Sequence, residues 1–238
     1  MATNATRAHS SLSGLSGFVA DLVKACAAPG CSVVDLGTGT GRLAGMLAQA
    51  GFRVTATDIT AECFEPKDIP FVTSDLNGPF AQALGGPFDG VVATELIEHL
   101  ENPRSFLRQC RVLLRDAGWV LLTTPNLENP VSKALFVRND HFLWFSDRER
   151  RSTGHITPIG RWYLEKAAQD AGFVVERMGS FGCPYAEIGS WPKMKALAHL
   201  LGWVAGTPPE LRGEILFVLL RMANGAAPGG GPASAEHA

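Results

Sequence analysis

Short runs of consecutive apolar residues alternate along this chain with longer segments in which apolar residues recur every three or four positions. The short runs are typical of strands buried on both faces of a sheet, and the longer segments are typical of helices that bury one face. The expected strands cover about 33–36, 53–58, 71–76, 88–94, 119–126, 172 onward and 215–220, and the expected helices cover about 12–28, 42–50, 103–115 and 159–171. This alternation predicts one α/β domain built on a mostly parallel sheet.

The first expected strand runs into a glycine-rich loop and then into a helix. Asp35 closes the strand, glycines occupy positions 37, 39 and 41, and apolar residues at helical spacing follow from Arg42. Glycine allows backbone conformations with positive φ and lets a ligand approach closely, and the start of a helix presents unpaired N–H groups. The stretch therefore predicts a binding site for a nucleotide-like ligand.

The acid before the loop argues against a dinucleotide. In the dinucleotide fingerprint the third glycine comes one residue later than Gly41, and the two phosphates lie on the helix start. Asp35 would repel those phosphates, whereas it would attract a ligand that carries an ammonium and a sulfonium group. An NAD-dependent reductase remains an alternative on the evidence of the loop alone.

Acids also close the second and third expected strands. Asp58 comes about 20 residues after the loop, where a carboxylate can bind both ribose hydroxyls. The other interpretation of Asp58 is a cap for a helix that starts at Thr60. Asp75 closes the third strand, in a stretch that also fits an ordinary turn.

With these motifs in this order, the sequence resembles the class I S-adenosyl-L-methionine (SAM) methyltransferases over about residues 32–221; their first motif reads as an apolar pair, an acid and Gly-x-Gly-x-Gly. The resemblance implies a Rossmann-like, doubly wound sheet of seven strands with an antiparallel last strand. It also implies SAM as the cofactor and S-adenosyl-L-homocysteine as the product, with Asp75 at the adenine amino group and Leu76 on the adenine ring. The full set of expected cofactor residues is Asp35, Gly37, Thr38, Gly39, Gly41, Asp58, Ile59, Asp75, Leu76 and Thr94.

The size and charge of the chain limit its organisation and its partners. Its 238 residues, 46% of them hydrophobic, suffice for one domain, expected over 1–224 and followed by a disordered tail over 225–238. A net charge of −2 gives no reason to expect long nucleic acid as a partner. Five cysteines without CxxC spacing, no signal segment and no apolar stretch of about 20 residues predict a reduced, cytoplasmic protein. The apolar stretch Ala196–Val204 is a candidate for contact with a membrane surface.

Two segments are longer than the connections of a compact domain usually are. Residues 126–158 contain Phe and Trp residues with arginines interleaved, and residues 181–213 are rich in Trp and Leu. We expect both insertions to form a lid over a small-molecule acceptor that is apolar or aromatic. Core packing is the alternative role of their aromatic residues.

Chemistry is expected where the fourth strand ends. If a helix starts there, Glu95, Glu98 and His99 lie one turn apart and point at a common centre. The pattern Glu-x-x-Glu-His resembles methyltransferases that act on polyprenyl-catechol intermediates of ubiquinone synthesis, and those that cap the 3′-terminal ribose of small RNAs. In the second group a His before a later helix joins the site, and His155, with Arg161 six residues on, occupies that place in this sequence.

Three roles for this set stay open. Carboxylates and imidazole nitrogens suit a divalent cation such as Mg²⁺, with Glu95, Glu98, His99 and His155 as its ligands. Without a metal, His99, His155 and Glu98 are the candidate catalytic residues, as a base or as substrate ligands. A purely structural role is the third interpretation. His141 is the alternative to His155 as the second histidine of this site.

The sequence thus predicts a SAM-dependent methyltransferase that transfers a methyl group to a hydroxyl of a small molecule. Because the sulfonium donor is already activated and transfer is an in-line displacement, the protein has to align the acceptor and remove its proton. The alternatives are 2′-O-methylation of a terminal RNA ribose, reduction with NAD, and SAM binding without catalysis.

Overall fold

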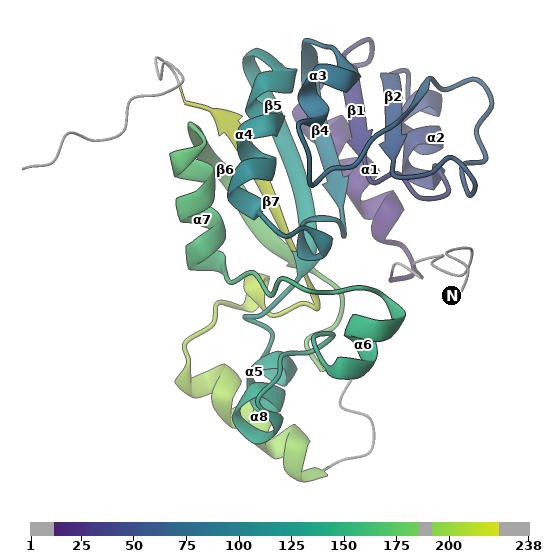
Figure 1. Ribbon diagram of the computed structural model, residues 1–238. Coiled ribbons are helices and arrows are strands. Elements are labelled where there is room, and N and C mark those ends of the chain that lie inside the picture. Colours follow the sequence, from purple (N-terminus) through teal and green to yellow (C-terminus); the bar gives the residue numbers. More distant parts are fainter. Residues whose placement is uncertain (1–11, 186–191, 224–238) are drawn as a thin grey trace, which may run out of the picture.

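A computed structural model describes residues 12–185 and 192–223 of the chain (Figure 1). Within these residues, seven strands form one sheet in the order β3-β2-β1-β4-β5-β7-β6. Strands β1 to β5 pair in parallel, and β7 runs antiparallel to both β5 and β6. This topology confirms the expected fold class. The bounds are β1 Ser32–Leu36, β2 Arg53–Asp58, β3 Phe71–Thr73, β4 Phe88–Thr94, β5 Leu114–Pro125, β6 Phe173–Phe181 and β7 Ile215–Met222.

Helices cover both faces of the sheet. One hydrophobic cluster joins α3, α4 and α7 to one face, and a second joins α1 and α2 to the other. Because β1 to β5 run in the same direction, their carboxyl ends meet at one edge, which is where ligands bind in open α/β sheets. The bounds are α1 Leu15–Cys26, α2 Arg42–Gln49, α3 Phe80–Leu84, α4 Pro103–Leu113 and α7 Arg161–Asp170.

Three expected boundaries are wrong. We expected the helix over 103–115 to be followed by a strand that starts at 119, but α4 ends at Leu113 and β5 begins at once with Leu114. The backbone at Leu114 is extended and the residue pairs with Phe88 of β4, so sheet pairing ends the helix early. The strand expected over 71–76 ends at Thr73, because a turn at Asp75 follows.

Close packing between β4 and β5 depends on a glycine. A Cβ on Gly90 would lie 2.2 Å from the ring of Trp119, which is buried. Replacing Gly90 with Ala is therefore expected to lower the free energy of unfolding by about 1–3 kcal/mol, the usual cost of overpacking a core. Chemical denaturation of the two proteins measures the difference.

Gly45→Ala is the matched control for this prediction. Gly45 lies inside α2, and nothing comes within 4 Å of the position that its Cβ would take. Alanine should raise stability there by up to about 1 kcal/mol, because it favours the helix. A Gly90→Ala protein as stable as the native chain would contradict the packing argument.

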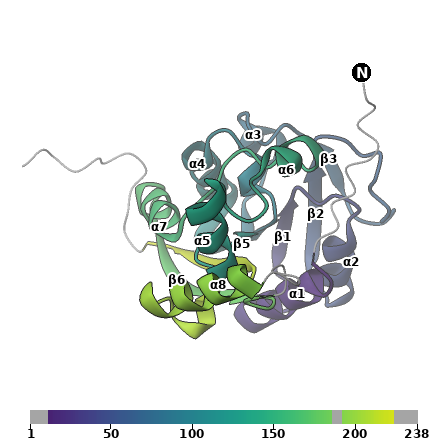
Figure 2. The same cartoon turned by 90° about the horizontal axis from the view of Figure 1, so that it is seen from below.

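The two insertions fold into one unit, residues 126–158 and 192–213, which we call the cap. Its helices are α5 Pro130–Asn139, α6 Asp147–Ser152 and α8 Pro192–Val204. Helices α5 and α8 pack together through a small hydrophobic cluster of their own. Figures 1 and 2 show the cap at the edge of the sheet where the parallel strands end. Residues 186–191 and the tail expected over 225–238 lie outside the described residues, and the lid role stays a prediction.

Buried asparagines join the two parts of the cap. The side-chain amide of Asn126 donates to the carbonyls of Leu211 and Gly213, at 2.7 Å each. The amide of Asn129 donates to the carbonyl of Arg212 at 2.8 Å. The start of the first insertion is thereby fixed to the end of the second.

None of the helices in the described part of the chain is long and apolar enough to cross a membrane.

Candidate active site

The glycine-rich loop forms between β1 and α2 as expected. Gly37, Gly39 and Gly41 have φ angles of 71°, 55° and 79°, in the left-handed region that favours glycine. A Cβ on Gly41 would also lie 2.6 Å from the side chains of Phe64 and Pro66. The sharp path of the loop therefore requires glycine at these positions.

Two carboxylates flank this loop. Asp58, at the end of β2, accepts a hydrogen bond from the backbone N–H of Gly39 at 2.8 Å. Asp35, in β1, accepts one from the hydroxyl of Thr38 at 2.7 Å. No helix follows Asp58 in the described segment 59–70, so its alternative role as a helix cap is wrong.

Burial of the Asp35 carboxyl favours its protonated form. The residue is 2% exposed, and burial raises its pKa to about 7. The hydrogen bond from Thr38 opposes this rise in pKa, and the neighbouring Asp58 carboxylate adds to it. A cationic group placed beside Asp35 would favour the ionised form.

The other expected cofactor residues follow the ends of β2, β3 and β4. Ile59 is 66% exposed just beyond β2, and Asp75 accepts a hydrogen bond from the backbone N–H of Asn77 in the turn after β3. Thr94 closes β4, and its buried hydroxyl has no hydrogen-bond partner among the described residues. Leu76 packs in the core with 7% of its surface exposed, which leaves little of it for an adenine ring.

The segment after β4 differs from the expected helix start. Glu95 has a φ of 49°, and only Ile97–His99 form a short 3₁₀ helix. The Glu95 carboxylate accepts a hydrogen bond from the hydroxyl of Thr123 on β5 at 3.1 Å. The helical geometry expected to bring Glu95 to His99 is therefore wrong.

A loop of the cap is hydrogen-bonded to this segment. The backbone carbonyl of Glu98 accepts bonds from the N–H groups of Ile156 and Thr157, at 3.0 Å each. The hydroxyl of Thr157 donates to the carbonyl of Leu100 at 2.6 Å. These bonds hold His155 beside the end of β4.

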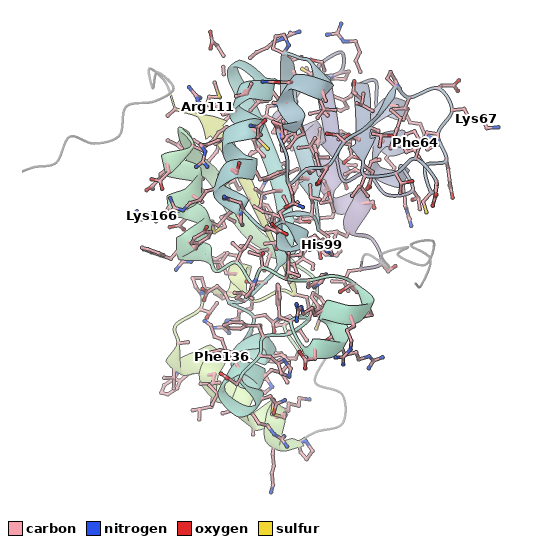
Figure 3. The ribbon with its side chains drawn as sticks, in the orientation of Figure 1. Phe64, Lys67, His99, Arg111, Phe136 and Lys166 are labelled. Carbon is pink, nitrogen blue, oxygen red and sulfur yellow. The ribbon has the colours of Figure 1, made fainter. Side chains whose placement is uncertain are left out.

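His99 and His155 form a pair. Their ring centroids lie 4.8 Å apart at an interplanar angle of 74°, and Figure 3 places His99 between the sheet and the cap. Nδ1 of His99 lies 3.2 Å from the carbonyl oxygen of Gly154, and Nδ1 of His155 lies 2.9 Å from that of Trp144. Since a carbonyl oxygen only accepts hydrogen bonds, each neutral ring carries its hydrogen on Nδ1 and a lone pair on Nε2. Each Nε2 is thereby suited to take a proton or to bind a cation.

Glu98 completes a cluster with the two histidines. One potential ligand atom from each of the three residues lies within 4.8 Å of the others. Glu98 is fully buried; its Oε2 accepts a hydrogen bond from the hydroxyl of Thr124, and its Oε1 has no hydrogen-bond partner in the described part of the chain. Burial and the nearby Glu95 carboxylate raise the pKa of Glu98 well above its usual range. A neighbouring cation would favour the ionised form of Glu98.

The other candidates from the sequence lie outside this three-residue cluster. It does not include Glu95 or His141, and Nδ1 of His141 faces the carbonyl of Phe142 at 3.1 Å. Arg161 lies on α7, with its guanidinium 4.0 Å from the Glu165 carboxylate. Of the two rival histidines, His155 is the one that joins His99.

Sequence reasoning missed two hydroxyls of this site. Thr123 and Thr124, at the end of β5, hydrogen-bond to the carboxylates of Glu95 and Glu98 respectively. Their signal in the sequence is a pair of polar residues that closes an otherwise apolar strand. Such positions lie at the edge where parallel strands end.

Comparison with known proteins identifies the class of this chain. A family profile described as a methyltransferase domain matches residues 11–177, more than half of the chain. The chain therefore belongs to this family and is a class I SAM-dependent methyltransferase enzyme, whose cofactor is SAM. This identification excludes the NAD-dependent reductase.

Similar proteins with curated names include ubiquinone biosynthesis O-methyltransferases. The one from Xanthomonas campestris pv. campestris (strain B100) is 32% identical over 125 residues, which are 49% of this chain and 52% of the relative. The one from Burkholderia thailandensis is 31% identical over 106 residues, which are 41% of this chain and 46% of the relative. The chain thus spans about half the length of the curated relatives it matches.

Solved structures of similar fold include two methyltransferases. A SAM-dependent methyltransferase from Archaeoglobus fulgidus has a TM-score of 0.60 at 17% identity, covering 87% of this chain and 94% of that one. Magnesium protoporphyrin IX methyltransferase from Synechocystis PCC 6803, with bound SAH, has a TM-score of 0.59 at 17% identity, covering 87% and 82%. At this identity, the likeness establishes the fold alone.

Proposed function

We propose that this enzyme methylates a hydroxyl oxygen of a small molecule. The observation that carries the proposal is the pair His99 and His155, whose Nε2 atoms bear lone pairs at the edge of the sheet that also holds the glycine loop. The curated relatives are named O-methyltransferases, which supports oxygen as the accepting atom.

The SAM molecule is proposed to bind along the carboxyl ends of β1, β2 and β3. In this assignment Asp35 pairs with the ammonium group, Asp58 accepts the ribose hydroxyls and Asp75 accepts the adenine amino group. The glycine loop, with its positive φ angles, supports a close approach of the ligand to the backbone.

The proposed step is a single in-line displacement. The acceptor oxygen attacks the methyl carbon of SAM, the bond from that carbon to sulfur breaks, and S-adenosyl-L-homocysteine leaves as a neutral thioether. Nε2 of His99 or His155 takes the hydroxyl proton. The ring of Phe145, with its centroid 5.5 Å from that of His155, offers an aromatic wall for the acceptor.

We also propose that Glu98, His99 and His155 hold a divalent cation. The buried Oε1 of Glu98 is available as a ligand atom, and the Nδ1 contacts of both histidines are of the kind that orient metal-bound imidazoles. The sequence predicted Mg²⁺ with Glu95 as a further oxygen ligand. Without Glu95 the site offers two imidazole nitrogens and one carboxylate, which favour Zn²⁺ or Mn²⁺ because Mg²⁺ prefers oxygen ligands. When bound, such a cation would occupy the Nε2 lone pairs and would lower the pKa of the acceptor hydroxyl, so that proton removal by a histidine belongs to the metal-free enzyme.

An acceptor panel tests the proposed reaction. Release of S-adenosyl-L-homocysteine is measured with catechol, phenol, a sugar, an aliphatic alcohol and a short RNA with a free 3′ end, and mass spectrometry locates the new methyl group. Turnover at a hydroxyl of a small molecule is expected. Methylation of nitrogen or carbon, turnover confined to the RNA, or SAM binding without turnover on any acceptor would overturn the proposal.

Metal loading tests the second proposal by a readout other than activity. After incubation with Zn²⁺ or Mn²⁺ and removal of the excess, elemental analysis should find a stoichiometric ion in the native protein, and His155→Asn and Glu98→Gln should lose it. Glu95→Gln is the control and should keep the ion, because Glu95 lies outside the cluster. A native protein that retains no metal would contradict the proposal.

A further inference from the structure

The outward face of α8 is apolar. Leu200, Trp203 and Val204 are 53%, 78% and 64% exposed, and with Lys193 and Ala196 they recur at helical spacing on one side of the helix. The opposite side of α8 packs against α5. A helix that is apolar on both sides is not expected to leave one of them in water.

The charge of the cap differs in sign from that of the rest of the chain. Residues 126–158 and 192–213 contain eight Lys and Arg against five Asp and Glu, whereas the whole chain contains 21 against 23. Helix α8 carries Lys193 and Lys195, both exposed, and contains no acidic residue; α6 ends in the exposed Arg150 and Arg151. An anionic surface would therefore attract the cap and repel the remainder of the molecule, which orients the protein.

The position of α8 suits contact with a flat surface. Figures 1 and 2 show α8 beside α5, at the end of the molecule beyond the carboxyl ends of the parallel strands. The exposed face belongs to one helix of 13 residues, which is about 20 Å long. A face of that size is small beside the roughly 1,200 Å² that a stable protein interface buries. Shallow insertion of an aromatic and aliphatic face that also carries a lysine, in contrast, is enough to hold a helix on a lipid surface.

We propose that α8 docks this enzyme on the surface of an anionic lipid bilayer. Trp203 and Leu200 enter the headgroup region, and Lys193 on the same side of the helix pairs with a lipid phosphate, while the helix lies along the surface. The active-site loop with His155 belongs to the same cap, so docking brings the acceptor site near the lipid. The proposal does not depend on which acceptor the enzyme methylates.

Vesicle flotation tests the docking surface. The native protein should float with phosphatidylcholine vesicles that contain phosphatidylglycerol, bind less to pure phosphatidylcholine, and dissociate as salt is added. The double variant Trp203→Ser/Lys193→Glu should lose about tenfold or more in partitioning, since an apolar anchor is lost and one positive charge becomes negative.

The matched control makes the same two changes on α7. Trp162 is 70% exposed on α7. Lys166, which is labelled in Figure 3, lies one turn further along that helix. Trp162→Ser/Lys166→Glu should float like the native protein. SAM binding and melting temperature are measured for both variants, so a failure of docking is distinguished from a failure of folding or of the methyl-transfer proposal.

Three outcomes would overturn the docking proposal. The native protein could fail to bind phosphatidylglycerol vesicles, or the α7 variant could lose as much binding as the α8 variant. Light scattering could instead show a dimer that Trp203→Ser dissociates, with no vesicle binding, in which case a second copy of the chain covers the α8 face.

Discussion

Replacing Asp35 with Asn is expected to weaken SAM binding by about a hundredfold, the order of magnitude for removing one charge of a buried ion pair. In the native protein the Asp35 carboxyl has a pKa of about 7 because it is buried, so it must lose a proton before it pairs with the ammonium group of SAM. Native affinity should therefore rise with pH up to neutrality, and the variant should lose this dependence. Calorimetric titrations below about pH 7.5, where the ammonium group keeps its proton, measure both effects.

Asp35 also affects the stability of the ligand-free protein. Its folded pKa of about 7 lies above the ordinary value for Asp, which is about 4. Between about pH 4 and 7 the folded state therefore keeps a proton on Asp35 that the unfolded state has lost. The contribution of this group to stability is fully present below about pH 4 and is lost as the pH rises through about 7. Glu95, whose pKa burial also raises to about 7, adds a slope of the same sign. Without SAM, the Asp35→Asn protein should melt at a higher temperature than the native chain at pH 8.

Thr38→Val is the matched variant for this prediction. It removes the hydrogen bond that holds the Asp35 pKa down and keeps the carboxylate. Its SAM affinity should fall less than that of Asp35→Asn, and the pH dependence should move to higher pH. If Asp35→Asn binds SAM as tightly as the native protein and with the same pH profile, the ammonium group does not lie at Asp35.

The sheet and its glycine loop could be predicted because their signals are local. Runs such as Val33–Leu36 and Phe88–Thr94 are short, apolar and closed by polar residues, and the topology of parallel strands then orders them. The cap could not be predicted in the same way. Its two parts meet through Asn126 and Asn129, which bond to carbonyls more than 80 positions away.

In the candidate site, too, the residues with local signals could be predicted and those placed by long-range contacts could not. Asp35 and Asp58 flank the loop because neighbouring parallel strands end at one edge of the sheet. Glu95 leaves the expected helix because its backbone N–H donates to the Thr123 carbonyl of β5, a contact that the spacing of residues does not reveal. His155 was suggested only by a resemblance, and its place depends on the backbone bonds between the cap loop and Glu98.

Replacing His155 with Asn is expected to lower kcat by about 10²- to 10⁴-fold, the usual contribution of a general base. Asn keeps a polar side chain of similar size but cannot take a proton, so the acceptor hydroxyl would attack in its neutral form. SAM affinity should stay unchanged, because His155 lies in the cap and the expected SAM residues follow β1, β2 and β3. Release of S-adenosyl-L-homocysteine at saturating acceptor measures kcat, and calorimetry measures SAM binding.

His141→Asn and His99→Asn separate this role from a general effect on the cap. His141 lies in the same insertion with its Nδ1 on a backbone carbonyl, yet outside the cluster, so its replacement should leave kcat near the native value. If His99 and His155 act as one unit, the double variant should lose little more than the worse single variant, since residues that act together are not additive. A His155→Asn protein with native kcat, or a His141→Asn protein with an equal loss, would place the proton acceptor elsewhere. Glu98, the one carboxyl of the cluster, would then be the group to examine, because its raised pKa makes its ionised form a stronger base than an ordinary carboxylate.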